Sequence, residues 1–340
     1  MSSKINNVAV FIAISPSHIS SFQSLIKFTL KETHLILLNP GNFNFNEKLW
    51  DKVVQGDLNL RYRPRSFVKK ALFQIEKLKG YKRFYIKAKN IIGQSSVNLY
   101  FCHFEDVITN HFANELLKNN QNEFYVVEDG ILNYYMPKVN YRSLFFKKIL
   151  CSLIGLKFKI FYDHPTQIFK SWVNAQYVRM PEKAICPDKS IFLPFEPIDY
   201  QPNSENVLII GQDIRQEIDG KEEYSQKLEK LFNHVLDKVG DRKIYYKPHR
   251  NGDVKTAENL LKKVFGQYLL YDDPTPVEEC LGQLLPKNIF SFESTAILNI
   301  KLALKRDNVN LYVFPYMDDF PEIGELYKNL EISILNDISH

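Results

Sequence analysis

Hydrophobic and polar positions alternate in two ways along the second half of the chain. Short continuous apolar runs, typical of strands buried on both faces of a parallel sheet, alternate with segments whose apolar residues recur every three or four positions, as in amphipathic helices. The predicted strands are 207–211, 243–246, 267–271, 288–291 and 310–314. The predicted helices are 228–239, 254–264, a segment opening at Thr275-Pro-Val-Glu278, and 294–304. Regular alternation of strand and helix predicts a parallel sheet with helices on both faces.

The first half repeats this pattern less regularly. The predicted strands are 8–14, 33–38, 97–101 and 123–127, the predicted helices are 16–30 and 104–117, and the basic segment 50–82 is expected to be helical in part. Three prolines and several polar residues between 194 and 204 indicate a linker. We therefore expect an α/β fold of two Rossmann-like domains, residues 1–193 and 207–340, joined by residues 194–206 and facing each other across a cleft.

Length and composition agree with this division. A chain of 340 residues suits two domains, and a content of 45% hydrophobic and 24% charged residues is that of a globular protein. The net charge of +5 is mildly basic. It does not indicate a nucleic-acid partner, but it is compatible with an anionic ligand or with an acidic membrane surface.

The cysteines and the apolar runs bear on the compartment. The four cysteines are far apart, and no C-x-x-C pair occurs, so the sequence predicts neither a zinc site nor a disulfide framework. The run 8–14 is at the lower length limit for a signal peptide, and no run approaches the ~18–20 residues needed to span a bilayer. We expect a soluble cytoplasmic protein.

Two segments could place chemistry at strand ends of the first domain, because open parallel sheets bind ligands at the carboxyl ends of their strands. Glu128-Asp129-Gly130 follows strand 123–127. Two adjacent carboxylates raise the pKa of one of them, which suits a general base, although Asp-Gly is also a common turn. Ser15-Pro-Ser-His18 follows the first strand and either lines the site or is an ordinary loop.

Two strand ends of the second domain are similar. Lys247-Pro248-His249-Arg250 follows strand 243–246 and offers three donors to a phosphate, with His249 able to donate a proton; a solvated turn is the alternative. Gly211-Gln212-Asp213 closes the first strand, so we expect Asp213 to point toward the cleft.

Two predicted helix starts could bind a nucleotide. Thr275-Pro-Val-Glu278 has the pattern of a capping box with proline at the first helical position, and Glu278 could instead bind ribose hydroxyls. Ser291, Ser294 and Thr295 enter the next helix, where hydroxyls and free backbone N–H groups form an anion site unless Ser294 only caps the helix. No P-loop, dinucleotide fingerprint or Asp-x-Asp pattern occurs, so no cofactor and no metal is expected.

The order of these motifs resembles the bacterial sialyltransferases of GT-B fold, namely the polysialyltransferase-like family and glycosyltransferase family 52. Their [DE]-[DE]-G motif matches Glu128-Asp129-Gly130, and their Ser-[Ser/Thr] motif matches Ser294-Thr295. The His-Pro motif is matched in part, because the proline precedes His249 and Arg250 follows it. The resemblance extends from residue 8 to about 314.

The resemblance implies an inverting, metal-independent transfer of sialic acid from CMP-sialic acid to a hydroxyl of a bacterial surface glycan, either lipooligosaccharide or capsule. It implies that His249 protonates the departing phosphate and that Glu128 is the base, with Asp129 and Asp213 as the other candidates. The implied donor-binding residues are Gly211, Gln212, Lys247, Pro248, Glu278, Ser291, Ser294 and Thr295.

Several alternatives stay open. The donor could be CMP-Kdo, another CMP-nonulosonate or a UDP-hexose, and a non-catalytic role in glycan assembly is a further candidate. The segment 144–159 is both apolar and basic. It is either a membrane-surface patch near a lipid-linked acceptor at the inner membrane or a core helix whose lysines point outward. A homodimer is also left open.

Overall fold

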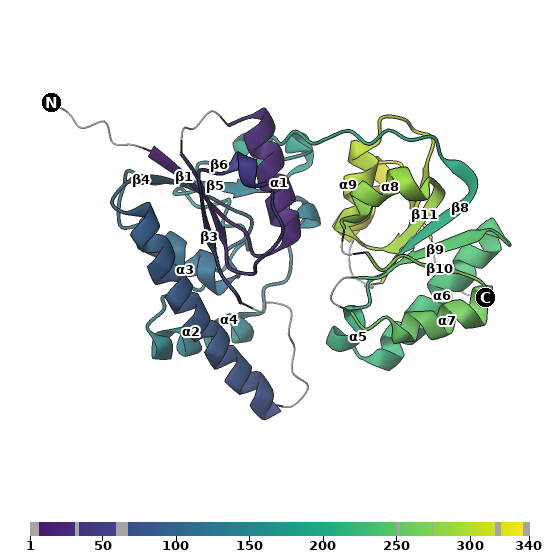
Figure 1. Ribbon diagram of the computed structural model, residues 1–340, viewed down its shortest axis with the longest axis horizontal. Helices are drawn as coiled ribbons and strands as arrows, with labels where there is room; N and C mark the ends of the chain where they lie inside the picture. The colour runs from purple at the N-terminus through teal and green to yellow at the C-terminus, as the bar shows by residue number, and fades with distance from the viewer. Residues whose placement is uncertain are drawn as a thin grey trace. The chain divides into compact units, whose positions relative to one another are not determined.

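The computed structural model describes residues 7–30, 34–58, 67–249, 252–273, 275–316 and 321–335. The chain divides into two compact units, Met1–Phe195 and Glu196–His340. Each unit is a parallel sheet with helices packed on it (Figure 1). The division lies at the start of the predicted linker, and the first strand of the second unit begins at Asn203, inside the segment predicted to be linker.

The first unit contains a seven-stranded parallel sheet in the order β3-β2-β1-β4-β5-β6-β7. From β1 the chain adds β2 and β3 on one side of the sheet and then returns to add β4 to β7 on the other side of β1. The direction of strand order therefore reverses between β1 and β4, and open sheets bind ligands at such a point. The strands are β1 (Asn7–Ile12), β2 (Leu35–Asn39), β3 (Lys52–Gln55), β4 (Ser96–Phe101), β5 (Glu123–Val127), β6 (Ala175–Val178) and β7 (Ser190–Phe192).

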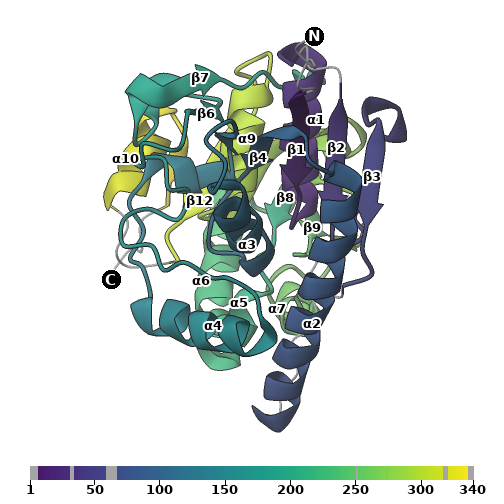
Figure 2. The same cartoon turned by 90° about the vertical axis from the view of Figure 1, so that its left-hand side faces the viewer.

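Helices cover both faces of this sheet because successive side chains of a strand point to opposite faces. Val8, Val10 and Ile12 of β1 pack with helices α2 (Phe67–Ile92), α3 (Val107–Leu116) and α4 (Tyr141–Ile154). Ala9 and Phe11 pack with α1 (Pro16–Phe28) on the other face. Figure 2 shows α2, α3 and α4 together on the side nearest the viewer. Short 3-10 helices cover Glu47–Leu49, Gly130–Tyr134, Pro181–Lys183 and Pro187–Lys189.

The second unit contains a six-stranded parallel sheet in the order β10-β9-β8-β11-β12-β13. In Figure 1, α6 and α7 lie on one face of this sheet, and α8 and α9 lie on the other. The strands are β8 (Asn203–Ile210), β9 (Lys243–Lys247), β10 (Leu269–Leu270), β11 (Pro286–Phe292), β12 (Asn310–Phe314) and β13 (Ser333–Ile334). The helices are α5 (Arg215–Ile218), α6 (Lys221–Val239), α7 (Lys255–Phe265), α8 (Val277–Leu284), α9 (Thr295–Ala303) and α10 (Pro321–Asn329).

The predicted α/β class is confirmed, with differences in detail. The sequence pattern did not predict β3, β6, β7 or β13, each of which is only two to four residues long. The predicted capping box is wrong: α8 begins at Val277, so Pro276 occupies the N-cap instead of the first helical position. The backbone N–H of Thr275 donates to Asp273, and Glu278 accepts a hydrogen bond from Asn299 at 2.9 Å. Within the described ranges, no helix is long and apolar enough to cross a membrane.

Candidate active site

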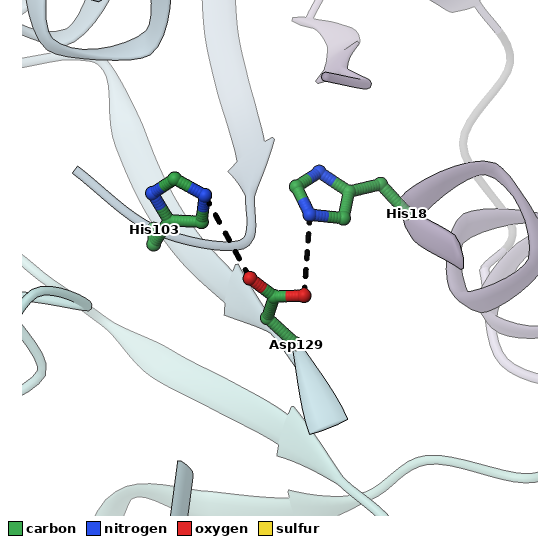
Figure 3. Close-up of side chains that lie close together, drawn as sticks. All are labelled: His18, His103 and Asp129. Atoms are coloured by element: carbon green, nitrogen blue, oxygen red, sulfur yellow. Dashed lines mark ion pairs between the residues drawn. The ribbon is translucent and has the colours of Figure 1, made fainter. Parts of the chain in front are cut away.

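Three side chains meet at the carboxyl end of neighbouring strands in the first unit. Asp129 follows β5, His103 follows β4, and His18 lies in the first turn of α1, after β1. Because β1, β4 and β5 are parallel neighbours, their carboxyl ends lie at one edge of the sheet. His18 Nε2 is 3.3 Å from Asp129 Oδ1, and His103 Nε2 is 3.7 Å from Asp129 Oδ2 (Figure 3).

His18 orients the Asp129 carboxylate, and His103 lies beside it. The backbone N–H of Ile14 donates to His18 Nδ1 at 3.4 Å, so the ring proton of His18 is on Nε2 and faces Asp129. His18 is buried, whereas the Asp129 side chain is 27% exposed and therefore accessible to a substrate. Burial lowers the pKa of His103, which keeps its imidazole neutral near pH 7. A fixed and accessible carboxylate is what a general base requires.

The same three groups could in principle hold a cation, since their ligand atoms lie within 4.8 Å of one another. A metal-bound histidine offers a lone pair and donates its other N–H to a neighbour. His18 has the opposite arrangement, because its Nδ1 accepts a hydrogen bond from Ile14. The donor set therefore fits a hydrogen-bonded base better than a metal centre.

Glu128, the neighbour of Asp129, is in a different environment. Its side chain is buried, and its Oε1 accepts a hydrogen bond from the Arg179 guanidinium at 2.7 Å. Its Oε2 accepts from the backbone N–H of Arg179 at 2.7 Å and from the hydroxyl of Tyr134. These contacts join the end of β5 to the residue that follows β6, and they occupy both carboxylate oxygens.

In the second unit, a buried carboxylate fixes the backbone at His249. Asp213 Oδ2 accepts the backbone N–H of His249 at 2.8 Å, and Oδ1 accepts the hydroxyls of Tyr224 and Tyr246 at 3.0 and 2.7 Å. Burial raises the pKa of Asp213. The sequence led us to expect Asp213 to point toward a cleft, but the side chain is fully buried among these donors. The imidazole of His249 is only half-buried.

Gly211 makes this arrangement possible by its lack of a side chain. A Cβ atom at residue 211 would lie 2.2 Å from Tyr246 Oη and 2.7 Å from Asp213 Oδ2, closer than atoms approach without a displacement.

The segment after β9 contains the other candidate donor-binding residues. Lys247 donates from Nζ to the backbone oxygen of Asp273 at 2.7 Å. Pro248, half-buried, joins Lys247 to His249. Arg250 lies outside the described residues.

The remaining candidate residues have local partners. Ser294 caps α9 by accepting the backbone N–H of Ala296 at 3.1 Å. The side chain of Gln212 donates to the backbone oxygen of Glu293, which brings the end of β8 next to the start of α9. Ser291 is fully buried, and its hydroxyl donates to the Ile210 backbone oxygen at 3.1 Å. Ser294 and Thr295 are therefore at the N-terminus of α9, and Ser291 is inside the sheet.

Sequence reasoning missed His103 and Arg179. His103 follows the predicted strand 97–101, so an inspection of every strand end for polar residues would have found it. Arg179 follows β6, which the pattern did not reveal.

Comparison with known proteins identifies the family of this chain. Residues 9–313 match the model of a family described as alpha-2,8-polysialyltransferase (POLYST). The chain belongs to this family. No curated protein matches the chain.

Solved structures agree with the GT-B fold. The chain is similar to the glycosyltransferase of kitacinnamycin, with 10% identity, a TM-score of 0.55 and coverage of 98% of this chain and 87% of that one. It is also similar to a trehalose-6-phosphate synthase, with 11% identity, a TM-score of 0.52 and coverage of 97% of this chain and 87% of that one. A third similar structure is a putative UDP-N-acetylglucosamine 2-epimerase from Listeria monocytogenes, with 13% identity, a TM-score of 0.50 and coverage of 96% of this chain and 82% of that one. At these identities the similarity shows the fold alone. Together with the family, it makes this polysialyltransferase-family protein a GT-B glycosyltransferase.

Proposed function

We propose that this glycosyltransferase moves sialic acid from CMP-sialic acid to a hydroxyl of a bacterial surface glycan, with inversion at the anomeric carbon. The observation that carries the proposal is the polysialyltransferase family match over residues 9–313. The site supports it, because a partly exposed carboxylate in contact with His18 and beside His103 can act as the base that such a transfer requires.

Asp129 is the base in this proposal. It removes the proton of the acceptor hydroxyl while the oxygen attacks the anomeric carbon of the donor. The bond from that carbon to the CMP phosphate oxygen breaks, and His249 donates a proton or a hydrogen bond to the departing phosphate. Attack from the side opposite the leaving group inverts the configuration.

Asp213 holds the backbone at His249, whereas Glu128 joins the end of β5 to Arg179. Glu128 has both oxygens bound by Arg179 and Tyr134, and Asp213 has both oxygens bound by two tyrosines and the backbone of His249. Neither carboxylate is open to an acceptor hydroxyl. This geometry favours Asp129 over both as the base.

The donor binds to the second unit in this proposal. The backbone N–H groups at the start of α9, with Ser294 and Thr295, suit the single phosphate of a CMP-sugar, and Lys247 adds a positive charge. Glu278 is proposed to approach the ribose, where Asn299 holds its carboxylate. Gln212 and Gly211 shape the neighbouring loop.

The experiment that tests the function is nucleotide release. The protein is incubated with CMP-sialic acid and a sialylated oligosaccharide, and CMP is quantified by chromatography together with the extended glycan. CMP-Kdo and UDP-hexoses serve as competing donors. Release of CMP with glycan extension supports the proposal. Release of UDP alone identifies a hexosyltransferase, release from CMP-Kdo alone identifies a different donor, and release from none of them indicates a non-catalytic role.

Activity is expected to survive EDTA. The leaving group of a CMP-sugar carries one phosphate, whose charge can be met by Lys247, His249 and the N-terminus of α9. The measurement compares initial rates with and without the chelator. Complete loss of transfer in EDTA, restored by magnesium or manganese, would contradict this expectation and point to a metal-assisted nucleotide-diphosphate donor.

The proposal also includes a location. We place the reaction in the cytoplasm, at the inner face of the membrane, where lipid-linked acceptor glycans are available. The surface that could hold the protein there is on the first unit.

A further inference from the structure

Helix α4 has an exposed face that is largely apolar. Residues four apart lie on the same side of a helix. This places Tyr141, Phe145, Ile149 and Leu153 in one row, and Phe146 lies two turns before Leu153, beside that row. Leu144 and Cys151 anchor the opposite side of α4 in the core, whereas Leu153 is 78% exposed.

The exposed apolar residues are concentrated in this part of the chain. Of the 16 large hydrophobic residues that are exposed among the described positions, seven lie between residues 136 and 162. Single exposed apolar residues need no explanation, but a contiguous patch of them indicates an interaction site. The seven are Met136, Tyr141, Phe145, Phe146, Ile149, Leu153 and Tyr162.

The charge of this segment identifies the kind of partner. Residues 136–162 contain six basic residues and no acidic one. Lys147 and Lys157 are paired with Glu105 and Glu115 from elsewhere in the first unit, at 3.1 and 2.8 Å. The six are Lys138, Arg142, Lys147, Lys148, Lys157 and Lys159. Arg142 and Lys148 are the basic residues exposed on α4 itself. An apolar helix face that carries exposed cations matches an anionic bilayer, in which apolar side chains enter the acyl boundary and cations meet the headgroups.

A second copy of this chain fits the surface less well. A symmetric dimer would place the same patch against itself, and the cations of one copy would then face those of the other. Anionic lipid headgroups supply the opposite charge over the whole area.

We propose that the exposed face of α4 (Tyr141, Phe145, Phe146, Ile149 and Leu153) docks on an anionic bilayer surface. The opposite side of the same helix contributes Lys147, Leu150 and Cys151 to a cavity of about 220 Å³.

The cavity reaches the active site, because His103 and Ile14 also line it, and α2 contributes Lys77 and Tyr81. Its mixed polar and apolar lining suits a sugar. We infer that it receives the glycan of a lipid-linked acceptor presented by the bilayer to which α4 is bound. This second step rests on the proposed function, but the docking step does not.

The docking step is tested with vesicles. The full chain is centrifuged with vesicles of phosphatidylcholine mixed with phosphatidylglycerol, and with vesicles of phosphatidylcholine alone. We expect binding to the anionic vesicles that weakens as salt rises. The triple variant Phe145→Ser, Phe146→Ser and Leu153→Ser is expected to bind at least about tenfold more weakly, since each buried apolar side chain contributes more than a CH₂ group.

Matched variants separate the patch from general effects. Ile191→Ser, Phe192→Ser and Ile218→Ser remove three exposed apolar side chains elsewhere and are expected to leave binding unchanged. Arg142→Gln with Lys148→Gln is expected to weaken binding about fivefold per removed cation. Unchanged unfolding temperatures show that each variant is folded.

Three results would overturn the docking step. The first is equal vesicle binding by the triple variant and the wild type, and the second is equal binding of the wild type to neutral and anionic vesicles. The third is a wild-type dimer in solution together with a monomeric triple variant, which would make a second copy the occupant of this face.

The acceptor step is tested by comparing a sialylated oligosaccharide in water with the same oligosaccharide attached to a lipid in anionic vesicles. We expect the triple variant to retain transfer to the free acceptor and to lose at least about tenfold on the lipid-linked acceptor, in line with its weaker binding. Equal losses on both acceptors would overturn this step. If the wild type extends neither acceptor, the proposed function fails, and the vesicle-binding result is unaffected.

Discussion

The variant Asp129→Asn is expected to lower the transfer rate by about 10²–10⁴-fold, the usual contribution of a positioned acid or base. An amide of the same size can still accept the hydrogen bond from His18, so the cluster of His18, His103 and residue 129 should persist. It cannot take a proton from the acceptor. The measurement is CMP release at saturating donor, together with titration of CMP, whose affinity is expected to stay near that of the wild type.

Glu128→Gln is the matched control, because the two residues are adjacent. The amide removes the buried charge that faces Arg179, and loss of one partner of a buried ion pair costs about 3–5 kcal/mol. We therefore expect a lower unfolding temperature, with transfer retained wherever the variant is folded. If Glu128→Gln is folded but inactive while Asp129→Asn is active, then Glu128 is the base and Asp129 is not.

The variant His249→Ala is expected to reduce turnover by about 10²–10⁴-fold as well, through loss of the group that meets the departing phosphate. Its fold should be little affected. The backbone N–H of residue 249 donates to Asp213, and alanine retains that group. The measurement is kcat and KM for the donor, with the unfolding temperature as the check on folding.

Tyr246→Phe provides the comparison for His249→Ala. It removes one hydroxyl from the Asp213 carboxylate and leaves the imidazole of His249 in place. We expect a stability loss of about 1–3 kcal/mol, which is the cost of a buried group left without a partner, and a much smaller loss of turnover. Near-normal transfer by His249→Ala would remove the proposed role of the imidazole.

The alternation of strands and helices was sufficient to predict the fold class and most of the strands that position the site. Long apolar runs such as 207–211 have few alternatives to a buried parallel strand. By contrast, β6 and β7 have four and three residues, and they are ordered by pairing with β5 and with each other. These two strands form because of contacts between segments far apart in the sequence, and the local hydrophobic pattern carries no information about such contacts.

The candidate site could be predicted down to short segments but not down to single carboxylates. The strand-end rule selected Glu128 and Asp129 together. Their different environments depend on Arg179, some fifty residues later, on His18 in α1 and on His103 after β4. Asp213 was assigned by the same rule to an open position, although Tyr224 and Tyr246 surround it. The rule locates the edge of a sheet, whereas tertiary contacts decide which side chain is accessible there.

The two sides of α4 also set a length scale for the acceptor. A helix with its side chains is about 10–12 Å across. If one side rests on lipid headgroups and the other lines the cavity beside His103, the reacting sugar lies about one helix diameter above the bilayer. A glycan of a few sugars would reach that height while still attached to its lipid. A longer chain would extend beyond it and would have to bend back, so the proposed arrangement would favour the first additions on a short acceptor.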